Sequence, residues 1–197
     1  MDYKIIISLV AVTLVFVGYA PYIRDTVKGK TVPHIFSWLV WTLAVTISWA
    51  LQISGGAGVG AWTTGVTATI CFIVLLLSIR NGNKEITKLD LAFLFLALTS
   101  LALWIFAKQP VLSVILIVST DVFGFFPTIR KSWKEPHSET LFMYQITTIR
   151  HGLSIFALQQ FNILTLLYPI TWVLANLAFS VMLMIRRAML KKDVEKN

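Results

Sequence analysis

The sequence predicts an all-α membrane protein with seven transmembrane helices, from its apolar composition, its seven hydrophobic stretches and the placement of its basic residues. Of the 197 residues, 57% are hydrophobic and 13% are charged, and the mean hydropathy is +0.78. These values lie outside the range of an ordinary soluble domain. Each apolar stretch comes near the roughly 20 residues that cross a hydrocarbon core of ~30 Å. We expect the helices at 4–22, 34–53, 62–79, 89–107, 111–128, 140–159 and 163–185.

The basic residues gather in every second connection between the expected helices. The four groups are Arg24, Lys28 and Lys30; Arg80, Lys84 and Lys88; Arg130, Lys131 and Lys134; and, in the tail, Arg186, Arg187, Lys191, Lys192 and Lys196. The other connections contain only Lys108. By the positive-inside rule, the N-terminus is therefore outside and the C-terminus is cytoplasmic. Topology thus accounts for the net charge of +8, and we expect a lipid bilayer rather than a nucleic acid as partner.

The chain contains an internal repeat at a constant offset of 106 residues. The segment from Gly18 to Lys28 aligns without a gap with the segment from Gly124 to Lys134, and Gly, Pro, Ile, Arg and Lys coincide. Further matched pairs are Phe36 with Phe142, Trp38 with Tyr144, Ser48 with Ser154, Trp62 with Tyr168, and Ile79-Arg80 with Ile185-Arg186. The first three and the last three expected helices therefore form two related units.

The expected helix at 89–107 has no counterpart in the repeat, and parity explains its presence. Three crossings end on the side opposite to their start, so a spacer crossing is needed for the second unit to begin in the same orientation. We therefore divide the chain into a first repeat at 1–86, a spacer at 87–109, a second repeat at 110–186 and a basic cytoplasmic tail at 187–197. Two parallel repeats of this kind, in a 3+1+3 order, can enclose a cavity between them.

The repeated Gly-x-x-Pro-x-x-Arg motif and the 3+1+3 order resemble the SWEET and PQ-loop superfamily of transporters. The dipeptide that names the PQ-loop group stands here as Pro21-Tyr22 and Pro127-Thr128, so the chain is similar to a bacterial member with degenerate motifs. The resemblance implies alternating access with gates hinged by prolines, here Pro21, Pro33, Pro127 and Pro136. Such hinges are physically reasonable, because proline lacks an N–H and its ring permits a bend. We expect Pro33 and Pro136 to begin the second and sixth helices.

The resemblance also implies a solute pocket with an Asn on the third helix of each unit and a small polar residue on the middle helix. Asn176 fits the first role in the second unit. Ile70 stands at the repeat position of Asn176, so Thr67, on the same helical face, is the expected substitute. Ser48 and Ser154 fit the second role. A sugar is one candidate substrate, while an amino acid, a vitamin precursor and a small carboxylate stay open.

Three ionisable residues lie near the expected centre of the bilayer, where a charge costs at least ~2.5 kcal/mol. Asp121 is in the fifth expected helix, and Arg150 and His151 are adjacent in the sixth. In a functional interpretation, Asp121 or His151 takes up a proton to couple transport, or Arg150 neutralises an acidic group of the substrate. In a structural interpretation, Asp121 forms a static ion pair with Arg150 or His151. The sequence leaves both interpretations open.

Other conspicuous side chains indicate packing rather than chemistry. Cys71 is the single cysteine, so the chain has no disulfide framework and no metal-ligand spacing, and we expect neither a metal nor a cofactor. Trp38 and Trp41 are more typical of packing or interfacial anchors than of ligand stacking. Tyr168 lies near a predicted outer boundary and is typical of an aromatic belt.

These observations favour a small-solute transporter or facilitator in the plasma membrane of a prokaryote. The alternative is a membrane receptor or sensor that binds a ligand on the same scaffold without carrying it across. An enzyme is disfavoured, because no metal cluster and no His-Glu or Ser-Lys constellation supports catalysis. The sequence does not decide whether flux is proton-coupled or whether the chain forms a homo-oligomer.

The topology can be tested with alkaline phosphatase fusions, because this enzyme needs disulfides that form only outside the cytoplasm. A fusion after Gly58 should be active and a fusion after Arg80 inactive, since the first position is predicted outside and the second inside. Fusions of green fluorescent protein at the same positions provide the control and should give the opposite pattern. The reverse result in both reporters would contradict the assigned orientation.

Overall fold

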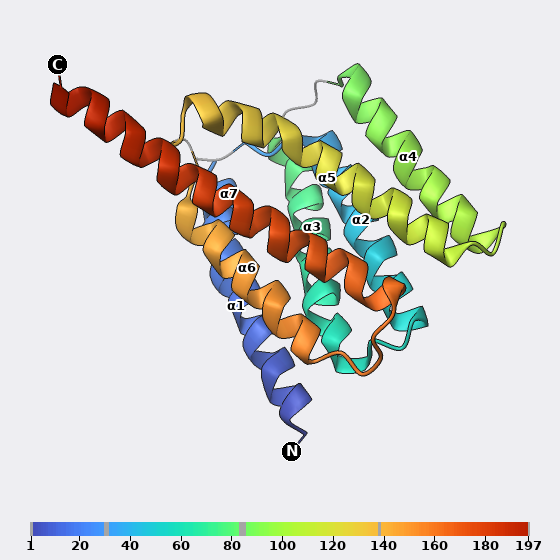
Figure 1. Ribbon diagram of the computed structural model, residues 1–197. Helices are drawn as coiled ribbons and strands as arrows, with labels where there is room; N and C mark the ends of the chain where they lie inside the picture. Colours follow the sequence, from blue (N-terminus) through green and yellow to red (C-terminus); the bar gives the residue numbers. More distant parts are fainter. Residues whose placement is uncertain (1, 30–31, 83–85, 138, 197) are drawn as a thin grey trace.

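The computed structural model describes residues 2–29, 32–82, 86–137 and 139–196, and the side chains of Asn81, Pro127, Lys131 and 191–196 lie outside this description. The described ranges form α1 (Tyr3–Val27), α2 (Ile35–Ser54), the short 3-10 helix η1 (Gly58–Ala61), α3 (Trp62–Asn81), α4 (Lys88–Ile105), α5 (Pro110–Lys134), α6 (Leu141–Phe156) and α7 (Ile163–Lys196) (Figure 1). No strand occurs in these ranges. The prediction of an all-α protein is confirmed, and each observed helix overlaps the range expected for it.

Six of the helices are long and apolar enough to cross a membrane, and α6 is the exception. With 16 residues, α6 is about 24 Å long, short of the roughly 30 Å of a hydrocarbon core. The expected span at 140–159 is therefore longer than the helix that forms there. Several apolar helices still make the chain compatible with a multi-pass membrane protein.

Side chains cap the starts of four helices, among them α7, where the Asn162 Oδ1 atom accepts hydrogen bonds from the Leu164 N–H at 3.0 Å and the Thr165 N–H at 3.3 Å. The Asp2 Oδ1 atom accepts a hydrogen bond from the Lys4 N–H of α1 at 3.1 Å, and the His34 Nδ1 atom accepts one from the Ser37 N–H of α2 at 3.3 Å. Thr87 and Asp90 form a reciprocal capping box at the start of α4. Such caps satisfy N–H groups that have no partner inside the helix. They explain why these helices start close to their predicted positions.

The four prolines expected as hinges have different surroundings. Pro21 lies inside α1, which continues to Val27, and buried Pro33 comes directly before the cap of α2. Pro136 is also buried but lies in the connection between α5 and α6, so the expectation that it begins α6 is wrong. Its carbonyl accepts a hydrogen bond from the Arg187 Nε of α7 at 3.0 Å, which fixes it in this connection. Pro127 falls within α5, and its side chain lies outside the described part.

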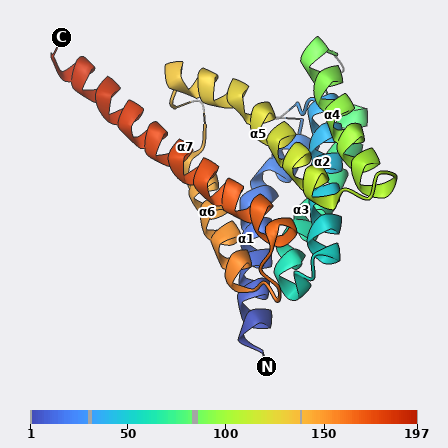
Figure 2. The same cartoon turned by 45° about the vertical axis from the view of Figure 1, so that its right-hand side comes forward.

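The helices pack in a ring with one helix outside it. The helix α3 contacts both α1 and α2, and α7 contacts both α5 and α6. Contacts of α1 with α6 and of α2 with α5 join these two groups, while α4 packs against α5 and α2 (Figures 1 and 2). In each group of three, the helix that comes third along the chain therefore lies between the other two in space.

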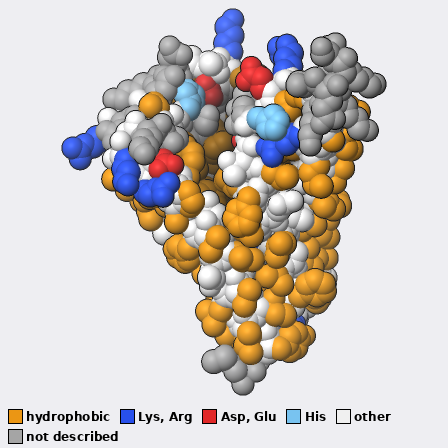
Figure 3. All heavy atoms as spheres, turned by 90° about the vertical axis from the view of Figure 1, so that its left-hand side faces the viewer, with side chains coloured by type: hydrophobic (Ala, Val, Ile, Leu, Met, Phe, Trp, Pro, Cys, Tyr) orange, Lys and Arg blue, Asp and Glu red, His pale blue; other side chains and the backbone are white. Residues whose placement is uncertain are grey.

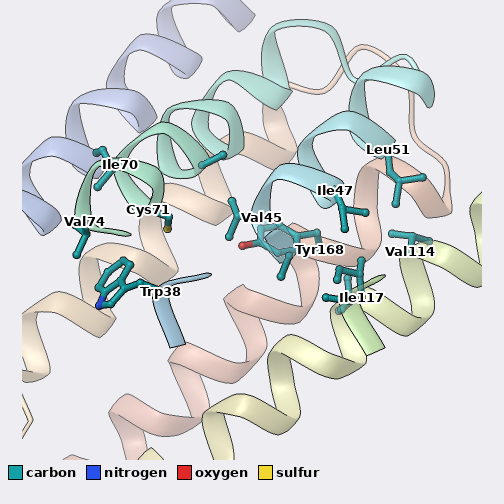
Figure 4. Packing of buried hydrophobic residues seen from close by; sticks show 14 of the residues in the cluster. Trp38, Val45, Ile47, Leu51, Ile70, Cys71, Val74, Val114, Ile117 and Tyr168 are labelled. Carbon is teal, nitrogen blue, oxygen red and sulfur yellow. The ribbon is translucent and has the colours of Figure 1, made fainter. Parts of the chain in front are cut away.

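The core lies where the ring helices meet. Val15 of α1, Leu51 of α2, Val74 of α3 and Ile117 of α5 are fully buried in one hydrophobic cluster. Tyr168 of α7 joins this cluster, and Figure 4 shows it among buried residues of α2. Since Tyr168 is only 4% exposed, the expectation that it belongs to an aromatic belt at the membrane surface is wrong.

The outer surface is apolar along the helices and charged at one end. Figure 3 shows Lys, Arg, Asp, Glu and His side chains gathered at the end opposite the N-terminus, above a body covered mostly by hydrophobic side chains. Large apolar residues such as Phe95 of α4 and Phe72 of α3 are half exposed or more. A contiguous apolar surface of this kind marks contact with lipid or another apolar partner. We call the end that carries these charged side chains, opposite the N-terminus, the charged end.

Two connections from opposite parts of the chain close the end where α1 begins. The Gln159 N–H donates to the Ala57 carbonyl at 3.0 Å, and the Asn162 Nδ2 donates to the Gly55 carbonyl at 2.7 Å. The Lys4 Nζ of α1 donates to the Leu158 carbonyl at 2.7 Å. We call residues 55–61 and 157–162 together the N-terminal seal.

Glycine allows the two connections of the seal to approach closely. A Cβ atom on Gly60 would lie 2.8 Å from the backbone N and Cα of Leu158, closer than real Cβ atoms come. Gly60, Ala57, Ala61 and Leu158 are all buried. The uncharged glycine-rich turn is therefore a packing surface for the segment that joins α6 to α7.

Replacing Gly60 by alanine should destabilise the protein by about 1–3 kcal/mol, the usual cost of overpacking a tight contact. The backbone of Leu158 cannot rotate away as a flexible side chain could. Gly18→Ala is the matched control, because a Cβ at Gly18 meets nothing within 4 Å, and alanine in a helix is neutral to stabilising. Thermal unfolding in detergent measures both variants. Equal melting temperatures for the two would contradict the close contact in the seal.

Candidate functional site

A cavity of about 420 Å³ lies inside the ring of helices. Every ring helix contributes to its wall, whereas α4 does not contribute a described residue. The lining residues are Tyr19 and Tyr22 of α1; Trp38, Trp41 and Val45 of α2; Thr67 and Cys71 of α3; Asp121, Phe125 and Thr128 of α5; Met143, Tyr144, Thr147, Arg150 and His151 of α6; Tyr168, Trp172 and Asn176 of α7; and Glu139 and Thr140 before α6. Figure 4 shows Trp38, Val45, Cys71 and Tyr168 among the packed residues of the core.

The cavity wall follows the internal repeat. Five pairs of lining residues stand 106 positions apart: Tyr19 with Phe125, Tyr22 with Thr128, Trp38 with Tyr144, Trp41 with Thr147, and Val45 with His151. On the middle helices, the lining residues recur every four positions, although they are not matched at the offset of 106: Thr67 and Cys71 of α3, and Tyr168, Trp172 and Asn176 of α7. Equivalent faces of the two groups therefore look onto one cavity.

The cavity extends toward the charged end and stops at the N-terminal seal. Tyr22 lies in the last part of α1, Trp38 in the first turn of α2, and Thr140 directly before α6. All three positions belong to the charged end of the ring. Toward the opposite end, Leu51 of α2 and Leu158 of the seal are buried and do not line the cavity. The site is thus closed on the N-terminal side.

Arg150 is buried in the cavity wall and is held by neutral groups of the first half of the chain. Its Nη1 donates to the Thr67 Oγ1 atom at 2.9 Å, and its guanidinium lies over the Tyr19 ring at 5.9 Å. Thr67 in turn donates to the Thr63 carbonyl of its own helix at 2.8 Å. The hydroxyl of Thr67 therefore positions Arg150.

Asp121 is buried as well, but it does not pair with a basic residue. The Trp172 Nε1 donates to its Oδ2 atom at 3.1 Å. Within the described residues, no nitrogen of Arg150 or His151 lies within 4.0 Å of its carboxylate. The static ion pair considered from the sequence is therefore not formed in this structure. Asp121 also borders a second cavity of about 260 Å³ between α2, α4 and α5.

His151 and Asn176 complete the deep part of the wall. The His151 ring meets Tyr168 edge-on, with 5.8 Å between ring centroids, and its Nδ1 atom is buried without a hydrogen-bond partner among the described residues. The Asn176 Nδ2 donates to the Trp172 carbonyl at 2.7 Å. This bond orients the amide of Asn176 on the helix that also presents Trp172.

The structure brings five of the predicted site residues to one cavity and leaves two outside its wall. Asn176, Thr67, Arg150, His151 and Asp121 all line the cavity. Ser48 and Ser154 do not occur among its described lining residues.

The two serines are buried elsewhere. The hydroxyl of Ser154 donates to the His151 carbonyl at 2.8 Å, as is common for serine in a helix. The Ser48 Oγ atom is buried without a hydrogen-bond partner in the described part of the chain. Neither hydroxyl is placed for binding a solute in this cavity.

Sequence reasoning missed most of the aromatic wall. Trp38 and Trp41 were expected as packing anchors, yet both line the cavity, with their ring centroids 5.2 Å apart in an edge-on arrangement. Phe125 and Trp172 make a similar pair at 5.7 Å, and Cys71, expected only to pack, lies in the wall as well. The repeat register could have indicated two of these positions, because it pairs Tyr19 with Phe125 and Trp38 with Tyr144.

Comparisons of the chain with models of known protein families, with curated proteins and with solved structures found no match. In the described part of the chain, no group of three or more His, Cys, Asp or Glu residues is placed to hold a metal ion. The cavity and its wall are therefore the features of the molecule that bear on its function.

Replacing Thr67 by valine should destabilise the protein by about 1–3 kcal/mol, because the buried guanidinium of Arg150 loses its acceptor. Thr67→Ser keeps the hydroxyl and should recover most of this loss. Thr69→Val is the control, since Thr69 is exposed and bonds only the Gly65 carbonyl of its own helix. Thermal unfolding in detergent measures the stability of these three variants. A Thr67→Val variant as stable as Thr69→Val would show that the contact contributes nothing.

Proposed function

We propose that the chain is a small-solute membrane transporter or facilitator of the SWEET and PQ-loop type that works by alternating access. The observation that carries this proposal is the cavity of about 420 Å³ between two similar groups of helices, closed at one end only. A volume between about 300 and 1,000 Å³ is typical of sites for small molecules. A sugar or another small polar metabolite is the proposed class of cargo.

The proposal includes seven crossings in the 3+1+3 order, with the N-terminus outside and the C-terminus in the cytoplasm of a prokaryotic cell. The helix bounds support this order. When α1 is shifted by 106 positions it covers residues 109–133, which nearly coincide with α5 at Pro110–Lys134. The same shift moves the start of α2 onto the start of α6. The third helix is in the middle of each group, as two copies of one unit require.

The short helix α6 is proposed as a crossing because of its surroundings. It packs against α1 and α7, so protein covers much of it. Its first residues border the cavity at the charged end. A helix that lines a cavity inside a bundle does not need to span the whole hydrocarbon core by itself.

Alternating access requires that the N-terminal seal opens while the charged end closes. The seal joins the two halves by few hydrogen bonds, such as those from Gln159 to Ala57 and from Asn162 to Gly55. Rocking of one helix group against the other would break these together. The prolines at the charged end, Pro21, Pro33, Pro127 and Pro136, are proposed as the hinges of this motion.

A disulfide across the seal should stop transport. A Cβ on Gly56 would lie 3.4 Å from the Gln160 Cβ, close to the separation found in disulfides, so the double variant Gly56→Cys with Gln160→Cys is placed to form one. Cys71→Ser removes the native thiol. Uptake of radiolabelled glucose, amino acids, nucleosides and carboxylates into proteoliposomes is measured with the bridge oxidised and reduced. The oxidised protein should lose uptake, and reduction should restore it.

The single variant Gly56→Cys is the control for backbone strain, because it places a side chain at a φ of +79° but cannot form the bridge. The single variant Gln160→Cys is the control for the second thiol. Equal uptake before and after oxidation of the double variant would contradict opening at the seal. A protein that binds a solute but carries none of the panel across the bilayer would favour the alternative, a ligand-binding receptor.

A further inference from the structure

Two opposite charges in the cavity wall are kept apart by neutral partners. Arg150 is 5% exposed and bonds Thr67, and Asp121 is 4% exposed and bonds Trp172. Burying a charge is costly unless an opposite charge offsets the loss of hydration. In the described part of the chain, neither residue finds that offset in a side chain within 4.0 Å. Both nonetheless border the same cavity.

Each of the two charges has hydrogen-bonding capacity left for a ligand. The guanidinium carries five N–H donors, of which the described contacts use one, toward Thr67. The carboxylate of Asp121 accepts from Trp172 through Oδ2, whereas two carboxylate oxygens can accept about four bonds. Arg150 therefore suits a carboxylate, which it can bind with two parallel bonds, and Asp121 suits an ammonium group.

The rest of the wall is mainly aromatic. Trp38 and Trp41 form one edge-on pair and Phe125 and Trp172 another, both facing the cavity. Aromatic rings bury flat apolar groups well and also attract cations to their faces. Tyr144 packs against the pair of Phe125 and Trp172, with 6.1 Å between the ring centroids of Tyr144 and Phe125. A sugar, which is neutral and polar, would leave the charges of Arg150 and Asp121 unmatched.

We propose that the cavity binds a zwitterion with an aromatic or similarly flat apolar body, its carboxylate on Arg150 and its ammonium group on Asp121. An aromatic α-amino acid has this chemistry. A ligand with both charges offsets both buried residues at once, whereas a ligand with one charge leaves the other unpaired. The inference rests on the proposed function in one respect: it takes the cavity as the solute site.

Five probes test separately what the carboxylate, the ammonium group and the ring of this ligand contribute to binding. L-Phenylalanine carries both charges and the ring, phenethylamine lacks the carboxylate, 3-phenylpropanoate lacks the ammonium, L-alanine lacks the ring, and D-glucose is neutral. Isothermal titration of the full-length protein in detergent measures their dissociation constants. L-Phenylalanine should bind about tenfold or more tightly than phenethylamine and 3-phenylpropanoate, since a hydrogen bond to a charge is worth that factor. It should also bind more tightly than L-alanine, which buries no ring against the aromatic wall, and than D-glucose, which carries neither charge.

Substitutions assign each end of the ligand to its residue. Arg150→Gln should remove the preference for L-phenylalanine over phenethylamine and keep the preference over 3-phenylpropanoate. Asp121→Asn should remove the preference for L-phenylalanine over 3-phenylpropanoate and keep the preference over phenethylamine. Ser154→Ala is the matched control, because Ser154 is buried in the same helix as Arg150 but outside the cavity wall. If Arg150→Gln does not fold, Arg150→Lys keeps the charge and should weaken L-phenylalanine by loss of the paired bonds.

The probe series on the wild type decides the inference without any variant. Binding of 3-phenylpropanoate or phenethylamine as tightly as L-phenylalanine would overturn it, as would a clear preference for D-glucose. Proteoliposome uptake tests the proposed function separately. Selective binding of L-phenylalanine without uptake would support the ligand class and contradict transport, and uptake of glucose alone would support transport and overturn the ligand class.

Discussion

The cavity has a single closed end because two connections from opposite halves of the chain hydrogen-bond to each other. The Gln159 N–H and the Ala57 carbonyl satisfy one another at 3.0 Å, which matters near a bilayer, where unpaired backbone groups are costly. Gly60 lets the two backbones touch. Without this seal, the ring of helices would surround a path open at both ends. The enclosed site and its shielded charges both depend on this contact.

The cavity is partly symmetric in its aromatic wall and asymmetric in its charges. Tyr19 and Phe125 stand at equivalent positions, but the repeat positions of Asp121 and Arg150 are Val15 and Ala44, which are fully buried. The first half therefore has no charge of its own at these places. It contributes instead the hydroxyl that holds Arg150, across the interface between α3 and α6. One half supplies the charge, and the other fixes its position.

Much of this arrangement follows from local features of the sequence, and the rest depends on how the helices face each other. Hydrophobic length predicts the helices well, and the rule that membrane charges point inward predicts that Asp121 and Arg150 share a cavity. The rotation of each helix about its axis is set by its neighbours, so Ser48 and Tyr168 could not be placed from the sequence. For the same reason, the sequence could not exclude an ion pair of Asp121 with Arg150 or His151, because only the packing of the helices sets the distance between these side chains.

The helix that supplies more polar side chains to the cavity wall than any other is also too short to span a bilayer alone. Thr147, Arg150 and His151 line the cavity from α6, which has only 16 residues and does not count among the candidate spans. Its packing against α1 and α7 places its polar face toward the cavity, while Phe142 and Phe156 remain exposed on the other side. Length and apolar composition together therefore identify the other six helices and pass over the one that supplies Arg150 and His151 to the site.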